Sequence, residues 1–339
     1  GGVDEAQGGD GAAAVLVGDD SPAAPVIAER IGGAGVTEEL LERWRTPGSR
    51  RSRAWEERFG EVKYAPLATE AWKLALGEAG IGPEAVDHLI VTGMHARAVR
   101  GITARLGATN AATVDDLAAS VGNTGTAHPA LLLASALENA EPGKVIALIV
   151  LADGVDVLLL RTTPAIAGFR PARSVASQIA NGASLPYGKF LSWRDVVKLE
   201  PPRRPEPNRI SASISARTIG YKYGFAGSQD RSTGAAHLPP QRISRDGGAL
   251  DEMETMPMAD SIGTISTFTI DRIAYSPSPP IVFAVVDFDN GARLPAELCD
   301  VDADTLAMGG KVEMTFRRLF TADGIHNYFW KARPVRGEG

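Results

Sequence analysis

Residues 144–162, KVIALIVLADGVDVLLLRT, constrain the fold of this chain more than any other stretch. Two apolar runs flank an Asp153-Gly154 pair, a combination that favours a tight turn. Each run is apolar at consecutive positions, which is typical of strands that are covered on both faces. The pattern therefore predicts two buried strands in a layered α/β domain whose sheet has helices on both sides.

The residues before these strands alternate between helical and strand patterns. Helical spacing at 67–79 and 96–107 ends in each case at a glycine, and DHLIVTG (87–93) predicts a buried strand between them. VGNTGTAHPALLLASALENAEPG (121–143) predicts a loop followed by an apolar helix, with Pro129 near its first turn. This order of elements supports the α/β interpretation.

Two further stretches precede this region. GGDGAAAVLVGDD (8–20) has turn residues on both sides of an apolar run, so we predict a buried strand. Its Asp-Gly opening repeats that of the strand beginning at Gly154, which suggests two similar structural halves. The charged segment 37–59 is predicted to be helical in part, with an interruption at Pro47-Gly48.

The second part of the chain has a different character. Residues 164–208 are polar and rich in proline, which predicts a linker with a short helix in WRDVVKLE. The chain beyond residue 261 is rich in β-branched and aromatic residues, and Asp289-Asn290-Gly291 is typical of a hairpin turn. We predict about five antiparallel strands in a small closed barrel such as the OB-fold.

Three stretches of the first region resemble the thiolase superfamily, most of all hydroxymethylglutaryl-CoA synthase and type III ketoacyl synthase: GGDGAAAVLVG, HLIVTGMHARAVR and VGNTGTAHPALLLASALENAEPGKVIALIVLADG. The resemblance covers most of residues 8–163. It implies a thiolase-like domain over 1–163 that is incomplete and mostly the second of two halves, with 8–20 as the last strand of the first half. It also implies that the nucleophilic cysteine lies in the half absent from this chain.

The resemblance assigns catalytic roles to His95 and Asn123, which would donate hydrogen bonds to a thioester oxygen and stabilise the enolate or oxyanion. From the residues alone, His95 could equally cap a loop carbonyl and Asn123 could stabilise its own turn. Arg97 and Arg100 could bind a CoA phosphate or form a solvated helix face. Cys299, the single cysteine, has acidic neighbours that oppose thiolate formation, so it is not our candidate nucleophile.

Residues 187–335 resemble a zinc-ribbon and OB-fold family that accompanies thiolase-like enzymes, on the stretches YGFAGSQDRSTGAAHLPPQRIS and GTISTFTIDRIAYSPSPPIVFAVVDFDNGARLPAEL. The family's four cysteines match Asp230, Thr233, Ser244 and Gly247. Because none of these is a thiolate, and His237 with Asp230 cannot replace four ligands, we predict no structural zinc. We expect a degenerate ribbon over 209–260, either as a metal-free loop or disordered, and an OB-fold barrel over 261–339.

Charge, cysteine content and hydropathy bear on the possible partners and on the compartment of the protein. A formal charge of −6 argues against nucleic-acid binding. We expect most of the barrel aromatics to be core residues; they are Phe268, Phe283, Phe316, Tyr328, Phe329 and Trp330. The single cysteine indicates a reducing, cytoplasmic compartment, and no apolar run is long enough for a membrane span.

The leading hypothesis is an acyl-CoA condensing enzyme that forms a carbon–carbon bond, with a CoA thioester as substrate and no cofactor. It implies a homodimer, or a thiolase-like partner chain that supplies the missing half. The alternative is a non-catalytic subunit that binds acyl-CoA or bridges a thiolase-like complex.

Overall fold

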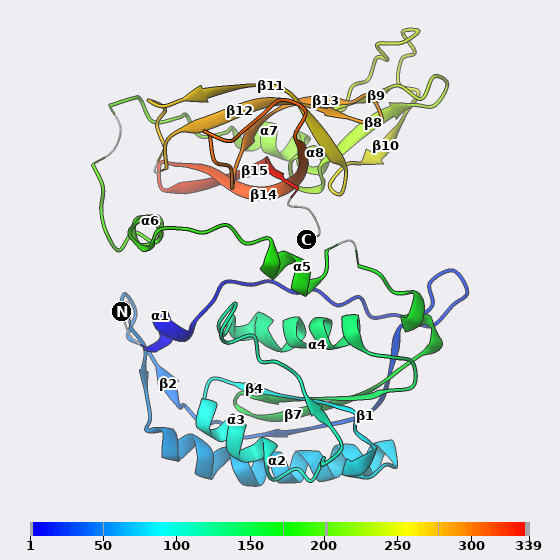
Figure 1. The fold of residues 1–339 in the computed structure, drawn as a ribbon, viewed down its shortest axis with the longest axis vertical. Helices are drawn as coiled ribbons and strands as arrows, with labels where there is room; N and C mark the ends of the chain where they lie inside the picture. Colours follow the sequence, from blue (N-terminus) through cyan, green and yellow to red (C-terminus); the bar gives the residue numbers. More distant parts are fainter. Residues whose placement is uncertain (1–2, 50, 172, 201–202, 277, 336–339) are drawn as a thin grey trace. The chain divides into compact units, whose positions relative to one another are not determined.

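The computed structural model describes residues 3–49, 51–171, 173–200, 203–276 and 278–335. The chain forms two compact units, Gly1–Gly182 and Ala183–Gly339 (Figure 1). The first unit is an α/β domain with a five-stranded sheet, and the second unit contains a closed β-barrel. The predicted fold class is therefore confirmed. Among the described residues, we find no helix whose length and apolar character would let it span a membrane.

The first unit is built on a five-stranded sheet in the order β1-β7-β6-β4-β5. Strand β7 runs antiparallel to both of its neighbours, whereas β4 runs parallel to β6 and β5. The strands are β1 (Ala28–Thr37), β4 (His88–Gly93), β5 (Ala112–Thr113), β6 (Val145–Leu151) and β7 (Gly154–Thr162). The predicted strands at 87–93 and on both sides of Asp153-Gly154 are therefore confirmed.

Helices cover both faces of this sheet (Figure 1). The helical elements of the unit are α1 (Val3–Gln7), α2 (Glu57–Ala79), η1 (Pro83–Ala85), α3 (Ala96–Thr103), η2 (Gly125–Ala127), α4 (His128–Asn139), η3 (Pro164–Gly168) and α5 (Val175–Ala180). Ile149 and Leu159 pack in the core that includes α2 and α3, and Ile146 packs in the core that includes α4. The consecutive apolar residues of β6 thus alternate between two cores, which explains the absence of a period of two in the hydropathy.

Helix α2 extends the predicted helix at 67–79 toward the N-terminus. The added turns begin at Glu57 and include Pro66 inside the helix. The helix ends where predicted, at Gly80, which has a left-handed φ of 64°. Backbone N–H groups at this cap donate to the carbonyls of Gly77 and Leu76 in the last turn.

The segment 37–49 and 51–56 is not helical, contrary to expectation. It forms a two-stranded hairpin of β2 (Arg43–Trp44) and β3 (Arg53–Ala54), and helix begins only at Glu57. The backbone N–H of Trp55 instead donates to the Glu42 carbonyl, so the two arms of the segment pair with each other across Pro47-Gly48.

Residues 8–20 were predicted to be a buried strand, and this prediction is wrong. Apart from an isolated bridge between Gly8 and Asn123 they adopt no strand in the described structure, and Leu16 is 99% exposed. The segment runs on the α4 side of the sheet, where Gly9 N–H binds the Asn123 carbonyl, rather than within the sheet (Figure 1). An apolar run becomes a buried strand only where a neighbouring strand pairs with it, and none of the described strands does.

The second unit combines a small sheet with the barrel. Its helices are α6 (Tyr187–Trp193), α7 (Ala212–Arg217) and α8 (Ile219–Gly224), and the small sheet has the order β10-β8-β9, from β8 (Ala226–Asp230), β9 (Ala236–His237) and β10 (Met253–Pro257). The helix expected in WRDVVKLE lies earlier and ends at Trp193.

The barrel has the order β11-β12-β13-β15-β14, and its strands are β11 (Ile262–Asp271), β12 (Ile281–Phe288), β13 (Arg293–Leu298), β14 (Lys311–Ala322) and β15 (Ile325–Pro334). The parallel pair of Leu298 with Ala332 joins β13 to β15 and completes the closure. Asn290 accepts a hydrogen bond from Ala292 N–H within the predicted hairpin turn, where Gly291 has a φ of 83°.

The barrel core is mostly aliphatic, although Phe288 is buried in it and Phe268 and Trp330 pack against it, so the expectation that most of the barrel aromatics are core residues is only partly met. Its most buried side chains include Ile265, Val286 and Met314. Of the six aromatic residues expected there, Phe283, Phe316 and Tyr328 are exposed, and Phe268, Phe329 and Trp330 are half-buried. A five-stranded barrel has a narrow interior, and medium-sized side chains fill it.

Two leucine variants test this arrangement. Leu159→Ala removes a fully buried side chain, and we expect it to lower the free energy of unfolding by about 2–5 kcal/mol. Leu16→Ala removes an exposed side chain and should change it by less than about 0.5 kcal/mol. Urea unfolding followed by circular dichroism measures both. A large effect of Leu16→Ala would show that the 8–20 segment is buried after all.

Candidate functional site

His95 lies just beyond the carboxyl end of β4 and precedes helix α3. Its carbonyl accepts the first helical hydrogen bond, from Val99 N–H, but its side chain makes no capping bond. The imidazole is buried instead, 6% exposed, with its ring centroid 6.0 Å from that of Tyr64 on α2. The capping role that the residues alone allowed is therefore absent.

Three buried polar atoms converge around this histidine. His95 Nε2 lies 2.6 Å from a carboxylate oxygen of Glu42, but the contact lacks the alignment of a hydrogen bond. The Tyr64 hydroxyl is buried as well, without an aligned partner among the described residues. Burial, and then the charge of Glu42, raise the pKa of the Tyr64 hydroxyl, so it stays protonated. The three groups interact with one another through the Glu42 carboxylate, so they form one buried polar cluster.

A glycine on α2 makes room for the imidazole. A Cβ at Gly60 would lie 2.8 Å from His95 Cγ, closer than side chains approach one another. Helix α2 therefore approaches His95 through its backbone, and the ring fits between this glycine and Glu42.

Asn123 joins the same end of β4. Its side-chain nitrogen donates to the Gly93 carbonyl, at 3.3 Å, two residues before His95. Its side-chain oxygen accepts from Gly125 N–H at 2.8 Å, which is the turn-stabilising role considered from the sequence. The Asn123 amide has a second N–H besides the one that binds Gly93. Its geometry is therefore compatible with stabilising its own turn and with donating a hydrogen bond to a ligand.

The two candidate arginines lie on the surface of α3. Arg97 donates to Glu61 of α2 at 2.7 Å, and Arg100 is exposed. Neither contacts the buried cluster around His95 in the described structure.

Cys299 lies in the second unit, where burial and then the Asp300 carboxylate raise the pKa of its thiol. A thiol with a raised pKa is mostly protonated near neutral pH and is a poor nucleophile.

Sequence reasoning missed Glu42 and Tyr64. Glu42 lies in a charged segment with no periodic signal, and Tyr64 was outside the predicted helix. His128, at the start of α4, was also missed. It is buried, which lowers its pKa, and Thr124 N–H points to its Nδ1 at 3.5 Å.

The positions that match the zinc ligands are brought together in the second unit. Asp230 accepts hydrogen bonds from Ser232 N–H, the Ser232 hydroxyl and Thr233 N–H. The hydroxyls of Ser244 and Ser232 hold the pKa of the Asp230 carboxyl far below its usual value. A Cβ at Gly247 would lie 3.8 Å from the Thr233 methyl group. A hydrogen-bonded carboxylate thus lies at the positions that the resemblance matches to zinc ligands.

These residues do not fit a zinc ion. Besides Asp230, only His237 in this cluster could ligate a metal, and its Nε2 already accepts from Arg245 N–H. In the described part of the chain, we find no group of three or more His, Cys, Asp or Glu residues that could hold a metal. The segment is an ordered sheet rather than a disordered loop.

Two family descriptions match this chain. Residues 76–158 match the C-terminal domain of 3-oxoacyl-(acyl-carrier-protein) synthase III, and residues 257–317 match the C-terminal OB-fold domain of ChsH2. The first match covers β4, α3, α4 and β6, and the second covers most of the barrel. These two stretches are therefore similar to a thiolase-like synthase domain and to an OB-fold domain. The barrel stretch in particular is similar to the OB-fold domain of ChsH2.

Among curated proteins, the chain is similar to two described as DUF35 domain-containing scaffold proteins. The protein of Methanothermobacter thermautotrophicus is 28% identical over 123 residues, which are 35% of this chain and 92% of the relative. The protein of Methanocaldococcus jannaschii is 25% identical over 126 residues, which are 36% of this chain and 89% of the relative.

Among solved structures, an Ltp2-ChsH2(DUF35) aldolase has a TM-score of 0.29 at 19% identity, over 39% of this chain and 98% of that one. The 3-oxoacyl-(acyl-carrier-protein) synthase III of Aquifex aeolicus has a TM-score of 0.34 at 18% identity, over 41% of this chain and 46% of that one. The chain thus spans less than half the length of this synthase.

A glycine variant tests the packing around His95. Alanine in place of a helical glycine normally stabilises a helix, by roughly 0.5–1 kcal/mol. We expect that gain for Gly77→Ala, where a Cβ on α2 would meet open space. Gly60→Ala should instead lower stability and shift the NMR resonances of the His95 ring, because its Cβ needs the space of the ring. Equal stabilisation by both would show that the imidazole lies elsewhere.

A second variant tests the hydrogen-bond network around the Asp230 carboxylate. Asp230→Asn removes the carboxylate charge, so we expect a lower melting temperature than that of the unmodified protein at pH 7. Because the folded-state pKa is depressed, the stabilisation is present above the unfolded value of about 4 and is lost as the pH falls below it. The two melting curves should therefore converge in acid. Asp246→Asn, on the same loop, is the control and should leave the melting temperature unchanged.

Proposed function

We propose that this chain is part of an acyl-CoA condensing enzyme of the thiolase type, similar to hydroxymethylglutaryl-CoA synthase. The observation that carries the proposal is the cluster of buried polar atoms of Glu42, Tyr64 and His95 at the carboxyl end of β4. A thioester oxygen in place of the Glu42 carboxylate would accept a hydrogen bond from His95 Nε2, and the remaining N–H of Asn123 lies near the same strand end.

In this role His95 and Asn123 stabilise negative charge. When a proton leaves the carbon next to a thioester, or when a nucleophile attacks the carbonyl, charge develops on the thioester oxygen. Preorganised donors in a site that excludes water lower the barrier to such steps. Tyr64 stays protonated because its pKa is raised, so it lines the site as a neutral donor.

The acyl-carrying thiol must come from elsewhere, because Cys299 has a raised pKa and lies in the barrel unit. We propose that a cysteine of a further thiolase-like half supplies it, either in a longer form of this protein or in a partner chain. A homodimer of such a complete protein is the arrangement that the thiolase resemblance favours.

The second candidate is a scaffold subunit that binds acyl-CoA or bridges a thiolase-like complex without catalysis. Both curated relatives are described as scaffold proteins. The barrel also exposes the stacked pair Phe316 and Tyr328, with ring centroids 5.8 Å apart, next to Tyr223. An exposed aromatic cluster of this kind suits a protein partner.

The test begins with the chain purified from its own cells with whatever polypeptide accompanies it. Iodoacetamide labelling with and without acetyl-CoA, followed by mass spectrometry, identifies any cysteine that acyl-CoA protects. We expect one protected cysteine other than Cys299. If Cys299 alone is labelled and acyl-CoA does not protect it, covalent acyl transfer is excluded and the scaffold function remains.

Site variants then separate catalysis from binding. In the assembled enzyme, His95→Ala and Asn123→Ala should each lower kcat for condensation by about 10²–10³-fold, the typical effect of losing one oxyanion donor. His326→Ala on the barrel surface is the matched control and should leave kcat unchanged. Full activity of His95→Ala would remove the histidine from the mechanism.

A further inference from the structure

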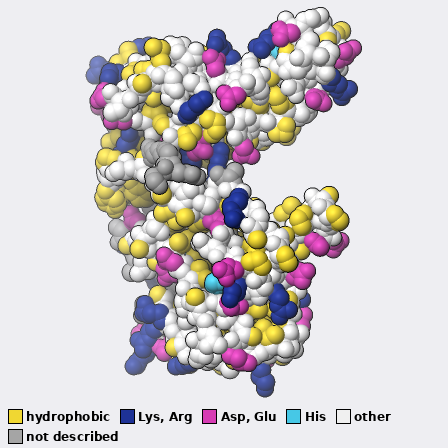
Figure 2. All heavy atoms as spheres, turned by 45° about the vertical axis from the view of Figure 1, so that its right-hand side comes forward, with side chains coloured by type: hydrophobic (Ala, Val, Ile, Leu, Met, Phe, Trp, Pro, Cys, Tyr) yellow, Lys and Arg dark blue, Asp and Glu magenta, His cyan; other side chains and the backbone are white. Residues whose placement is uncertain are grey.

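The hairpin of residues 43–55 concentrates positive charge. It contains five arginines and no acidic residue, although the whole chain has a formal charge of −6. Acidic and basic side chains are mixed over the molecular face drawn in Figure 2. Like charges repel one another at short range, so such a run is favourable when an anion binds to it.

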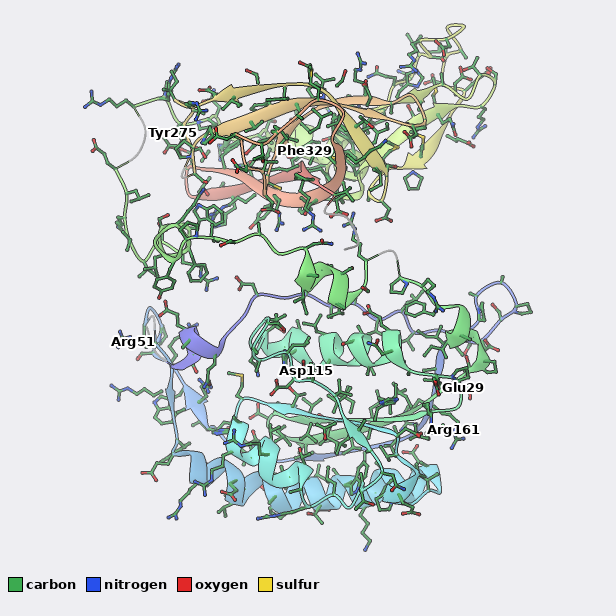
Figure 3. All side chains as sticks on the ribbon, in the orientation of Figure 1. Glu29, Arg51, Asp115, Arg161, Tyr275 and Phe329 are labelled. Atoms are coloured by element: carbon green, nitrogen blue, oxygen red, sulfur yellow. The ribbon has the colours of Figure 1, made fainter. Side chains whose placement is uncertain are left out.

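Three of these arginines are available to a ligand. Arg45, Arg51 and Arg53 are exposed, and none has an ion-pair partner among the described residues. Arg43 differs, since it binds Asp4 at 2.7 Å and anchors the hairpin to α1. Figure 3 shows Arg51 at the outer edge of the first unit, at the opposite end from Arg161.

The hairpin also exposes two tryptophans beside the arginines. Trp44 is 38% and Trp55 52% exposed, with ring centroids 5.6 Å apart. The indole of Trp55 is held in place, because its N–H donates to the Leu41 carbonyl at 3.1 Å and its ring lies 5.5 Å from that of Phe59. Exposed indoles next to guanidinium groups suit a planar base that carries phosphates.

The hairpin is bonded directly to the site at His95. The backbone N–H of Trp55 donates to the Glu42 carbonyl at 2.9 Å. The side chain of Glu42 in turn lies 2.6 Å from His95 Nε2. A ligand that spans both features therefore has a reactive carbonyl at one end and an anionic base at the other. Coenzyme A thioesters have this form, with a flexible arm between the thioester and the nucleotide.

We propose that the hairpin of residues 43–55 binds the adenosine 3′,5′-bisphosphate end of coenzyme A. Arg45, Arg51 and Arg53 contact the phosphates, and Trp44 or Trp55 stacks on the adenine. The inference rests on the proposed function for the choice of a thioester, but the nucleotide site itself does not require catalysis. It also differs from the sequence-based suggestion of Arg97, which is already paired with Glu61.

Calorimetry on the 339-residue chain tests the proposal with two probes, coenzyme A and adenosine 3′,5′-bisphosphate. We expect both to bind, and the triple variant Arg45→Ala/Arg51→Ala/Arg53→Ala to bind each about tenfold more weakly or worse, with steep salt dependence. The variant Arg105→Ala/Arg161→Ala removes exposed arginines elsewhere on the unit and should keep its affinity within about twofold. Equal losses in both variants would overturn a specific site.

Fluorescence provides a second readout that does not depend on charge. Adenine stacking should quench tryptophan emission, and Trp44→Phe or Trp55→Phe should reduce the quenching. Binding of an acidic acyl carrier protein but not of the bisphosphate would overturn the nucleotide assignment. If the bisphosphate binds and no protected cysteine is found, the hairpin site stands while the condensing function fails.

Discussion

Strand β6 lies between two apolar cores, and the first unit depends on this burial on both faces. Ala147 and Ile149 face the core formed with α2 and α3, whereas Ile146 and Leu148 face the core formed with α4. Each buried aliphatic side chain of this size contributes about 1.5–3 kcal/mol relative to exposure. Because β4 pairs with β6 in parallel register over Gly93 and Leu151, the same packing determines where β4 ends.

The position of that strand end determines the chemistry of the site. His95 emerges beside Gly60 of α2 and Glu42 of the segment before the hairpin, and Asn123 binds the Gly93 carbonyl. Three elements that are distant in sequence thus place polar atoms in one buried region. The Glu42 carboxylate interacts with both His95 and Tyr64 there, so one buried acidic group connects the segment before the hairpin, α2 and the end of β4.

The second unit contains a hydrogen-bonded carboxylate next to a small sheet. Asp230 and the neighbouring hydroxyl groups form a local network beside the three-stranded sheet of β8, β9 and β10. The barrel is closed independently, by pairing of β13 with β15, and its core is mostly aliphatic, with Phe288 buried among these side chains. Phe283, Phe316 and Tyr328 are exposed at the surface of the barrel.

The sequence by itself determined the elements whose signals are local. Consecutive apolar residues in β6 and β7, Gly80 at the end of α2 and the Asp289-Asn290-Gly291 turn each specify their structure through burial or backbone conformation within a few residues. It also led to His95 and Asn123, through the resemblance to thiolases. Only the tertiary structure decided which apolar runs find a partner: Leu16 is exposed because no described strand pairs with its segment. Likewise, Glu42 and Tyr64 join the site through contacts between distant segments, and such contacts have no periodic signature in the chain.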